Sequence, residues 1–265
     1  MSSFHLSSRE IETISGLAAG FSTTIVTHPL DVIKIRLQVS PNSSKNIKVS
    51  NYLSQYYRGL APNLVGNISA WGIYFALYAE FKNKIHTDNS TVNYFSSSVL
   101  AGISTSLLTN PIWVLKTRIL GSSKNETNAY KSAADGIKKM LKTEGISSFW
   151  KGSIPSLFSV FQASLQITIY DHMKNHLSHG TKEYLYTSAT SKIISMLVMY
   201  PTQVVRARLQ YSHTPSTIVS VIRELYAKEG GIKAFYKGIG ANILRVLPAT
   251  CVTFVVYEKV KKFLS

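Results

Sequence analysis

Acidic residues are scarce in this chain of 265 residues, which has 13 Asp and Glu against 29 Lys and Arg. Charged residues of both signs make up only 16% of the chain, whereas soluble domains have roughly 25%. The formal net charge is nevertheless +16, and the charges punctuate apolar stretches. A soluble nucleic-acid-binding protein usually gathers its basic residues on one surface. This distribution instead favours a membrane protein with an anionic cargo or anionic lipid contacts.

The chain has one cysteine, Cys251, and lacks the motifs of common enzymes. A single cysteine excludes an internal disulfide framework and a cysteine-rich zinc site. There is no Walker A loop, no Gly-x-Gly-x-x-Gly after a strand and no His-Glu-x-x-His pair. The seven histidines are scattered, and we interpret His28, just before a proline, as structural. The sequence therefore predicts no enzyme, no metal site and no cofactor.

The first ten residues do not have the pattern of a targeting segment, so we expect no cleavable presequence. Residues 1–10 are polar, no apolar core precedes a small-residue cleavage site, and no Arg-rich amphipathic presequence is present. We therefore expect any organelle address to be internal.

What the chain does have is a signature of one proline and two basic residues that occurs three times. It reads Pro-Leu-Asp-Val-Ile-Lys-Ile-Arg, Pro-Ile-Trp-Val-Leu-Lys-Thr-Arg and Pro-Thr-Gln-Val-Val-Arg-Ala-Arg, beginning at Pro29, Pro111 and Pro201. A second motif, aromatic-basic-glycine, follows each copy and ends at Gly59, Gly152 and Gly238. Paired motifs that recur in one order indicate three similar units in one pseudo-threefold body.

Six stretches are long enough to cross a hydrocarbon core of about 30 Å as helices. They are residues 10–38, 61–85, 93–120, 152–177, 184–210 and 239–263. Ser, Thr, Asn and Gln interrupt them, and polar atoms at membrane depth normally face the bundle interior or a wet cavity. The signature prolines should bend the odd-numbered helices so that they converge at one end. The sequence predicts an all-α membrane protein, with short amphipathic surface helices at 133–142 and 218–228.

The repeated signature resembles that of the mitochondrial carrier family, Pro-x-[Asp/Glu]-x-x-[Lys/Arg]-x-[Lys/Arg], followed by [Asp/Glu]-Gly-x4-[Trp/Tyr/Phe]-[Lys/Arg]-Gly. The resemblance covers the whole chain as one carrier domain, with repeats at about 9–87, 92–178 and 182–265. The first repeat is shorter and lacks the Glu-Gly pair. The resemblance implies six transmembrane helices in helix–amphipathic helix–helix repeats, and alternating access to one site. It also implies a functional monomer in the mitochondrial inner membrane, with both termini toward the intermembrane space.

The resemblance also indicates a substrate class. Trp113 stands where the family has an acid, and the Pro-Ile-Trp block is similar to the subgroup that carries folate, FAD, pyrimidine nucleotides and NAD. Residues 14–20, 66–75 and 242–254 are similar to its flavin and folate members, most of all to fungal carriers of FAD. We expect a carrier of FAD or a related flavin nucleotide, with folate, NAD and pyrimidine nucleotides as alternatives. A nonspecific channel and a basic soluble nucleic-acid-binding protein are the alternatives of other classes. Exchange or uniport, and the direction of net transport, stay open.

Two gates follow from the resemblance. The matrix gate comprises Asp31, Lys34, Trp113, Lys116, Gln203 and Arg206, with Gln38 and Gln210 as braces beneath it. In it we expect an Asp31–Lys116 ion pair, a Lys34–Gln203 hydrogen bond and a cation–π contact between Trp113 and Arg206. The cytoplasmic gate comprises Lys82, Asp171, Lys174, Glu258 and Lys261. There we expect Asp171 to pair with Lys261 and Glu258 with Lys82, in a network weak enough to open.

Two charges stand out as candidates for the central site. Arg245 follows the third aromatic-basic-glycine motif at the interval of a family contact residue, and Lys192 is an isolated charge deep in an apolar helix. Such a charge is costly unless it meets an anion or water, although Lys192 reaching a lipid headgroup is the alternative. The resemblance adds small and aromatic contact residues, for which ordinary helix packing is the alternative: Gly66, Ala70, Trp71, Tyr74, Ser159, Val160, Ala163 and Ser164.

The aromatic-basic-glycine motifs precede the even-numbered helices, where the resemblance implies that cardiolipin phosphates bind. Free N–H groups and the positive end of the helix dipole favour an anion at such a helix start. The residues implied are Arg58, Gly59, Lys151, Gly152, Lys237 and Gly238.

Overall fold

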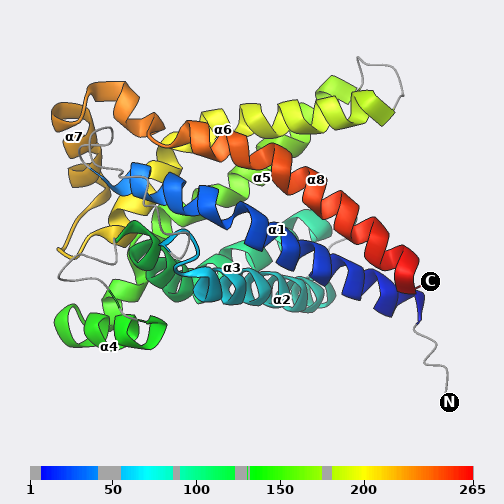
Figure 1. The fold of residues 1–265 in the computed structure, drawn as a ribbon, viewed down its shortest axis with the longest axis horizontal. Helices are drawn as coiled ribbons and strands as arrows, with labels where there is room; N and C mark the ends of the chain where they lie inside the picture. Colours follow the sequence, from blue (N-terminus) through cyan, green and yellow to red (C-terminus); the bar gives the residue numbers. More distant parts are fainter. Residues whose placement is uncertain are drawn as a thin grey trace.

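The computed structural model describes residues 7–40, 55–85, 90–122, 130, 132–174 and 181–264, and their regular structure is helical (Figure 1). The long helices are α1 (Ser8–Val39), α2 (Leu60–Lys84), α3 (Ser90–Gly121), α5 (Ser153–Lys174), α6 (Thr181–Tyr211) and α8 (Ile239–Leu264). The short elements are α4 (Ala133–Thr143), η2 (Ile146–Trp150), α7 (Ile218–Lys228) and η3 (Gly231–Tyr236). The predicted all-α class is confirmed, and the predicted bounds agree to within a few residues where the structure describes them.

The six long helices have 22 to 32 residues, and at 1.5 Å per residue each is long enough to cross a bilayer. By length and hydropathy alone, two stretches of the described chain qualify as membrane spans, Val92–Gly121 and Gly231–Leu264. Ser, Thr, Asn or Gln residues occur in every one of the six long helices. Helices that line a wet interior are expected to have this composition.

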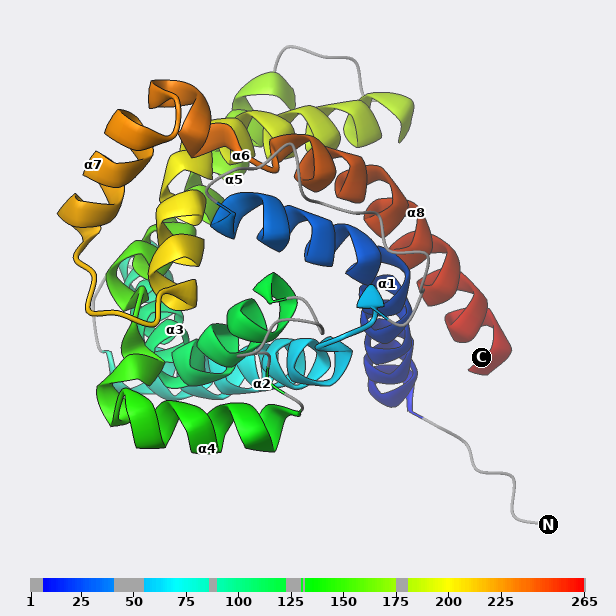
Figure 2. The same ribbon diagram turned by 60° about the vertical axis from the view of Figure 1, so that its left-hand side comes forward.

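The long helices form a ring in which neighbours from different repeats pack most closely. α1 packs against α8, α2 against α3, and α5 against α6, while α1, α3 and α6 also contact one another. Each of these three helices contains its signature proline. In Figure 2 the first turns of α1 run in a different direction from the rest of the helix. The predicted convergence of the three proline-containing helices is therefore present.

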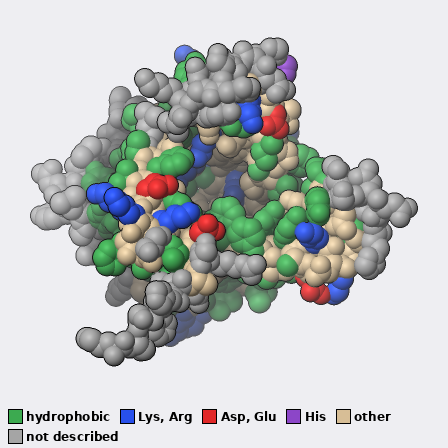
Figure 3. Space-filling model, turned by 90° about the vertical axis from the view of Figure 1, so that its right-hand side faces the viewer, with side chains coloured by type: hydrophobic (Ala, Val, Ile, Leu, Met, Phe, Trp, Pro, Cys, Tyr) green, Lys and Arg blue, Asp and Glu red, His purple; other side chains and the backbone are tan. Residues whose placement is uncertain are grey.

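The two ends of the ring differ. Both termini lie at one end, and α4 and α7 lie at the other (Figure 1). The buried apolar clusters gather at the α4 and α7 end, around Val32, Val114 and Met140 in one case and Tyr200 and Leu225 in the other. Figure 3 shows the end with the termini hollowed at its centre, with Lys or Arg side chains visible inside. The structure is thus closed at the signature end and open at the other.

Local sequence explains the short helices. Ser132 caps α4 by accepting a hydrogen bond from Asp135 N at 3.1 Å. In α7, Thr217 and Ser220 form a reciprocal capping box. Each helix buries one apolar face, through Met140 in α4 and Leu225 in α7. His28 is also structural, as expected: it is buried and hydrogen-bonds through Nε2 with Arg58 O at 3.2 Å.

Candidate functional site

The fifth residue after each signature proline is basic, and the three helices bring these cations to one level. We call Lys34, Lys116 and Arg206, with the residues three positions before them (Asp31, Trp113 and Gln203), the gate layer. Lys116 Nζ lies 3.8 Å from Asp31 Oδ2. Lys34 Nζ donates a hydrogen bond to Gln203 Oε1 at 3.1 Å. Both contacts join helices of different repeats, where the sequence predicts them.

Arg245 of α8 reaches the same layer. Its Nη1 lies 2.9 Å from Asp31 Oδ1, and its side chain is 37% exposed while that of Asp31 is 10% exposed. Lys192 of α6 is exposed and interacts electrostatically with Arg245. The two cations predicted for the central site are thus near each other. The sequence did not predict that Arg245 would share the carboxylate of the gate.

Trp113 has a different partner from the one expected. The cation over its ring is Lys116, whose Nζ is 5.0 Å from the ring centroid, and its Nε1 donates to Thr109 Oγ1 at 3.1 Å. Lys116 lies one turn further along the same helix, so it reaches the ring without crossing between helices. The predicted contact with Arg206 is therefore wrong. Within the described residues Arg206 forms no ion pair.

The expected braces do not hold the gate-layer cations. Gln38 Nε2 donates to Tyr200 Oη at 3.1 Å, and Gln210 Oε1 accepts from Thr117 Oγ1 at 2.8 Å. Their backbone carbonyls have a second role that the sequence analysis missed. The last arginine of each signature donates its Nε to the carbonyl at the brace position of the next repeat: Arg36 to Leu120 at 3.2 Å, Arg118 to Gln210 at 2.9 Å and Arg208 to Gln38 at 2.6 Å.

This cyclic arrangement explains why leucine is tolerated at the second brace position. A backbone carbonyl accepts the bond whatever the side chain is, and a charged donor makes it stronger than a neutral hydrogen bond. The signal was present in the sequence, since the arginine ends all three signatures at the same offset.

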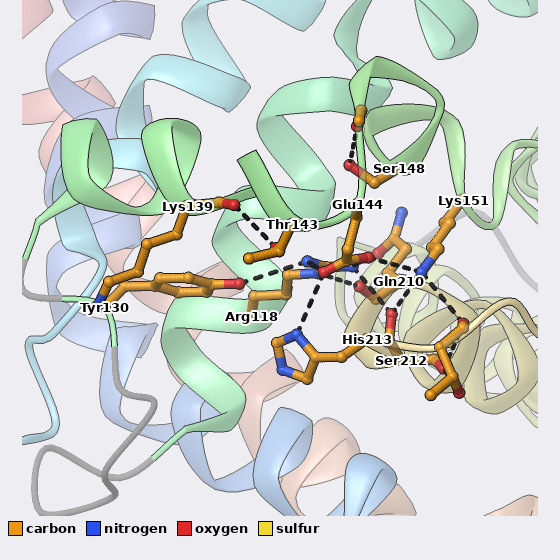
Figure 4. Close-up of polar contacts among 12 residues, drawn as sticks. Arg118, Tyr130, Lys139, Thr143, Glu144, Ser148, Lys151, Gln210, Ser212 and His213 are labelled. Carbon is orange, nitrogen blue, oxygen red and sulfur yellow. Dashed lines mark hydrogen bonds and ion pairs between the residues drawn. The ribbon is translucent and has the colours of Figure 1, made fainter. Parts of the chain in front are cut away.

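Two of the three repeats have a glutamate that forms ion pairs at the closed end, Glu144 in the second repeat and Glu229 in the third. Figure 4 shows Arg118, Lys151 and His213 gathered around Glu144. Arg118 forms two bonds to the carboxylate, at 2.5 and 2.8 Å, Lys151 Nζ lies at 2.7 Å and His213 Nδ1 at 3.3 Å. Burial opposes ionisation of Glu144, but the bonds from Arg118 and Lys151 outweigh it and lower its pKa to about 2.

The third repeat has the same kind of ion-pair cluster around a glutamate, whereas the first repeat uses hydrogen bonds to backbone carbonyls instead. Glu229 binds Arg208 at 2.6 Å and also Lys237. In the first repeat, which lacks the acid, Arg58 donates instead to Ser122 O at 2.6 Å and Tyr130 O at 2.7 Å. The basic residues assigned to cardiolipin therefore have protein partners.

The glycines of the same motifs are explained by packing. Gly59, Gly152 and Gly238 have φ of 79°, 74° and 80°, a conformation that glycine adopts readily. A Cβ would lie 2.3 Å from Leu120 at Gly59, 3.0 Å from Gln210 at Gly152 and 2.9 Å from Lys34 O at Gly238. Each glycine thus lets one repeat approach the proline helix of the next. Their role in cardiolipin binding stays a prediction.

The remaining central candidates lie on α2 and α5. A Cβ at Gly66 would meet Trp113 at 3.3 Å, and Tyr74 Oη lies 2.9 Å from Ser98 Oγ, so both residues face α3. Trp71 is 63% exposed and stacks on Phe75 with ring centroids 5.7 Å apart. Ala70 is half-buried.

On α5, Ser159, Ala163 and Ser164 are exposed, while Val160 packs on Gly102 of α3. The sequence analysis missed Gln162, whose Oε1 accepts a bond from Gln203 Nε2 at 2.9 Å and so connects α5 with the gate layer.

The expected cytoplasmic pairs are not formed in this structure. Asp171, Lys174 and Glu258 are exposed, Lys261 lies 3.5 Å from Glu12, and Lys82 lies over the ring of Tyr94 at 4.8 Å. Among the described residues, neither Asp171–Lys261 nor Glu258–Lys82 is within ion-pair distance. These residues lie at the open end of the ring, so the expectation is wrong for this state of the protein.

Comparison with known proteins agrees with the threefold repeat. The family described as mitochondrial carrier protein matches the chain three times, at residues 11–89, 87–181 and 179–265. The chain is 35% identical to the mitochondrial FAD carrier protein of Saccharomyces cerevisiae, over 94% of this chain and 96% of the relative. It is 31% identical to a chloroplastic folate transporter of Arabidopsis thaliana, over 95% and 94%.

A third relative is a mitochondrial nicotinamide adenine dinucleotide transporter of Saccharomyces cerevisiae, 31% identical over 96% of this chain and 77% of the relative. The matched repeats together span nearly the whole chain, and each contains one proline signature and one aromatic-basic-glycine motif. The chain therefore belongs to the mitochondrial carrier family and is a transporter, not an enzyme.

Proposed function

We propose that this protein carries FAD, or a related flavin nucleotide, across the mitochondrial inner membrane by alternating access. The observation that carries the proposal is the pair Arg245 and Lys192, two interacting cations from different helices, of which Arg245 also reaches Asp31 of the gate layer. A guanidinium suits bidentate binding of a phosphate, and an ammonium supplies a compact point charge. A dinucleotide with a diphosphate matches both groups. The similarity to a carrier of FAD favours the flavin nucleotide within this class.

Folate and NAD are the second candidates, because relatives named for them are also similar to this chain. Both are anions with planar rings, as are pyrimidine nucleotides, and the same cations would suit them. Exposed small residues on α5 leave room for a bulky ring, and Trp71 or Tyr74 offers an aromatic face for stacking. These features support the class of substrate and are shared by its members.

The proposed cycle uses the two ends of the ring in turn. The structure corresponds to the state closed at the gate layer, with Asp31 paired to Lys116 and Arg245. In the opposite state, Asp171 would pair with Lys261 and Glu258 with Lys82. The proposal further places both termini toward the intermembrane space, a cardiolipin phosphate at the starts of α2, α5 and α8, and a functional monomer.

Uptake into proteoliposomes tests the substrate directly. We expect labelled FAD to be taken up with a higher kcat/KM than folate, NAD or pyrimidine nucleotides. Arg245→Ala and Lys192→Ala should each reduce FAD uptake severely, whereas Trp71→Ala should reduce it less, because stacking contributes about 1–3 kcal/mol per ring. Thermal stability measured on the same samples controls for folding. Preferential uptake of folate or NAD would contradict the assignment of FAD as the substrate. Normal FAD uptake by both charge variants would show that Arg245 and Lys192 do not bind the substrate.

A further inference from the structure

The gate layer has too few negative charges for its cations. Among the three positions that precede its basic residues, only the first is acidic, Asp31, while Trp113 and Gln203 are neutral. Lys34, Lys116 and Arg206 interact electrostatically with one another, and Arg245 adds a fourth cation to the set. Four cations therefore share one carboxylate.

That carboxylate already has partners. Asp31 binds Arg245 through Oδ1 and Lys116 through Oδ2, and it also accepts a hydrogen bond from Asn63 Nδ2 at 3.5 Å. Its two oxygens are thus engaged by cations from α3 and α8. The positive charges of Lys34 and Arg206 are therefore not neutralised by an ion pair with Asp31.

The two remaining cations form no ion pair within the described residues. Lys34 donates to the amide oxygen of Gln203 and lies over the ring of Tyr200, 5.9 Å from its centroid. Gln203 is in turn fixed by its bond to Gln162. Within the described chain Arg206 has no carboxylate partner, although both side chains are half-buried. Cations held near each other away from bulk water are costly without a counter-charge.

We propose that Lys34 and Arg206 form an anion subsite at the floor of the hollow, which receives a phosphate group of the transported substrate. The bound substrate then supplies the negative charge that Trp113 and Gln203 leave out of the gate layer. This inference rests on the proposed function for the identity of the substrate, whereas the subsite itself requires only a phosphate-bearing ligand. Arg206 offers a planar fork for two phosphate oxygens, and Lys34, positioned by Gln203, offers a point charge.

The subsite explains why a carrier of this kind would do without two gate acids. A carboxylate three residues before each basic residue would occupy Lys34 and Arg206 and repel a phosphate. Because Trp113 and Gln203 are neutral, Lys34 and Arg206 stay available, and these two gate-layer cations can bind a phosphate of the substrate. The arrangement predicts that adding an acid to the gate layer weakens substrate binding.

The first experiment uses the purified full-length protein and inorganic pyrophosphate as the probe, with thermal stability as the readout. Lys34→Gln and Arg206→Gln are compared with Lys84→Gln and Arg223→Gln, the same changes at exposed positions of α2 and α7. We expect the pyrophosphate concentration for half-maximal stabilisation to rise about 10-fold or more in the first pair, as the loss of a charged hydrogen bond implies. It should stay at the wild-type value in the second pair.

The second experiment adds the missing acid with almost no change in shape. Gln203→Glu is compared with the wild type, and Trp113→Asp with Trp113→Asn, so that only charge differs within each comparison. Each acidic variant should bind pyrophosphate and FAD about 10-fold more weakly than its neutral counterpart. Riboflavin, which has no phosphate, should bind all of them alike. These variants keep the test decisive if Lys34→Gln or Arg206→Gln does not fold.

The outcomes separate the subsite from the substrate. If the wild type does not transport FAD but pyrophosphate binding depends on Lys34 and Arg206, the subsite stands and the flavin assignment fails. If pyrophosphate and FAD bind the acidic variants as well as the neutral ones, the subsite is wrong even if FAD is transported. Stabilisation by pyrophosphate that the exposed controls also lose would show general charge screening, which would likewise overturn the subsite.

Discussion

At the scale of single residues, carboxylates decide how the closed end holds together. Asp31 joins α1 to α3 and α8, and Glu144 binds Arg118 and Lys151 of its own repeat and His213 of the third repeat. Each of these two acids neutralises more than one cation. Removing such an acid leaves buried cations without compensation, which is usually more destabilising than the pair was stabilising.

Glu144 lends itself to a test by pH, since its folded pKa of about 2 is below its ordinary value of 4.5. A lowered pKa contributes stability that is fully present above about pH 4.5 and is lost as the pH falls toward 2. Glu144→Gln should therefore lower the melting temperature by about 5 °C at pH 7. The difference from the wild type should shrink as the pH falls below 4.5. Glu80→Gln, at an exposed ion pair, is the control. A difference that stays constant down to pH 3 would contradict the assignment.

At the scale of the elements, the repeats are joined head to tail around the ring. Each terminal signature arginine donates to a carbonyl of the next repeat, and each motif glycine lets its helix start lie against the proline helix of the next repeat. The arginine contacts use backbone carbonyls, so the side chains at the receiving positions can vary. This explains why glutamine and leucine both occur at these positions while the ring is preserved.

Gly238 provides a test of this packing. An alanine there would need φ near +80° and would bring its Cβ within 2.9 Å of Lys34 O. We expect Gly238→Ala to destabilise the protein by about 2 kcal/mol or more, measured as a lower melting temperature. Gly240→Ala is the matched control, because a Cβ at Gly240 meets nothing within 4 Å and alanine favours the helix. Equal melting temperatures for the two variants would show that the close approach is unimportant.

At the scale of the whole molecule, the structure is closed at one end and hollow at the other. The buried apolar clusters lie at the closed end, whereas the residues expected to gate the open end are exposed and apart. Alternating access requires both ends to be held by interactions of comparable and modest strength, because a carrier must visit both states. The sequence of the even-numbered helices supplies few charges for the second gate, which suits this requirement.

Exchanging the charges of Asp171 and Lys261 tests whether the cytoplasmic gate closes during the transport cycle. Asp171→Lys and Lys261→Asp should each slow transport at saturating substrate, because the cytoplasmic end cannot close well when like charges meet. The double variant should recover part of the rate, measured in proteoliposomes. Asp135→Lys on α4, with Lys139→Asp, is a control pair at the other end of the molecule. If the double variant transports no faster than the slower of the two single variants, the proposed Asp171–Lys261 ion pair is wrong.

The sequence by itself determined the repeats, the bounds of the long helices and of α4 and α7, and the level at which Asp31, Lys34 and Lys116 meet. These follow from local periodicity and from offsets that recur in every repeat, and such information does not depend on the rest of the fold. The Asp31–Lys116 and Lys34–Gln203 contacts could be predicted because threefold repetition converts an offset along the chain into a level in the ring.

Only the tertiary structure decided which charged side chains on different helices contact one another. α8 packs along α1, which brings Arg245 to Asp31, and no spacing within either helix predicts this contact. Trp113 takes Lys116 instead of Arg206, because a partner on the same helix is reached without ordering a second one. The unformed cytoplasmic pairs depend on which end is open. The physical reason is common to all three: charge pairing between helices depends on where whole helices lie, whereas the sequence pattern reports only what lies along each of them.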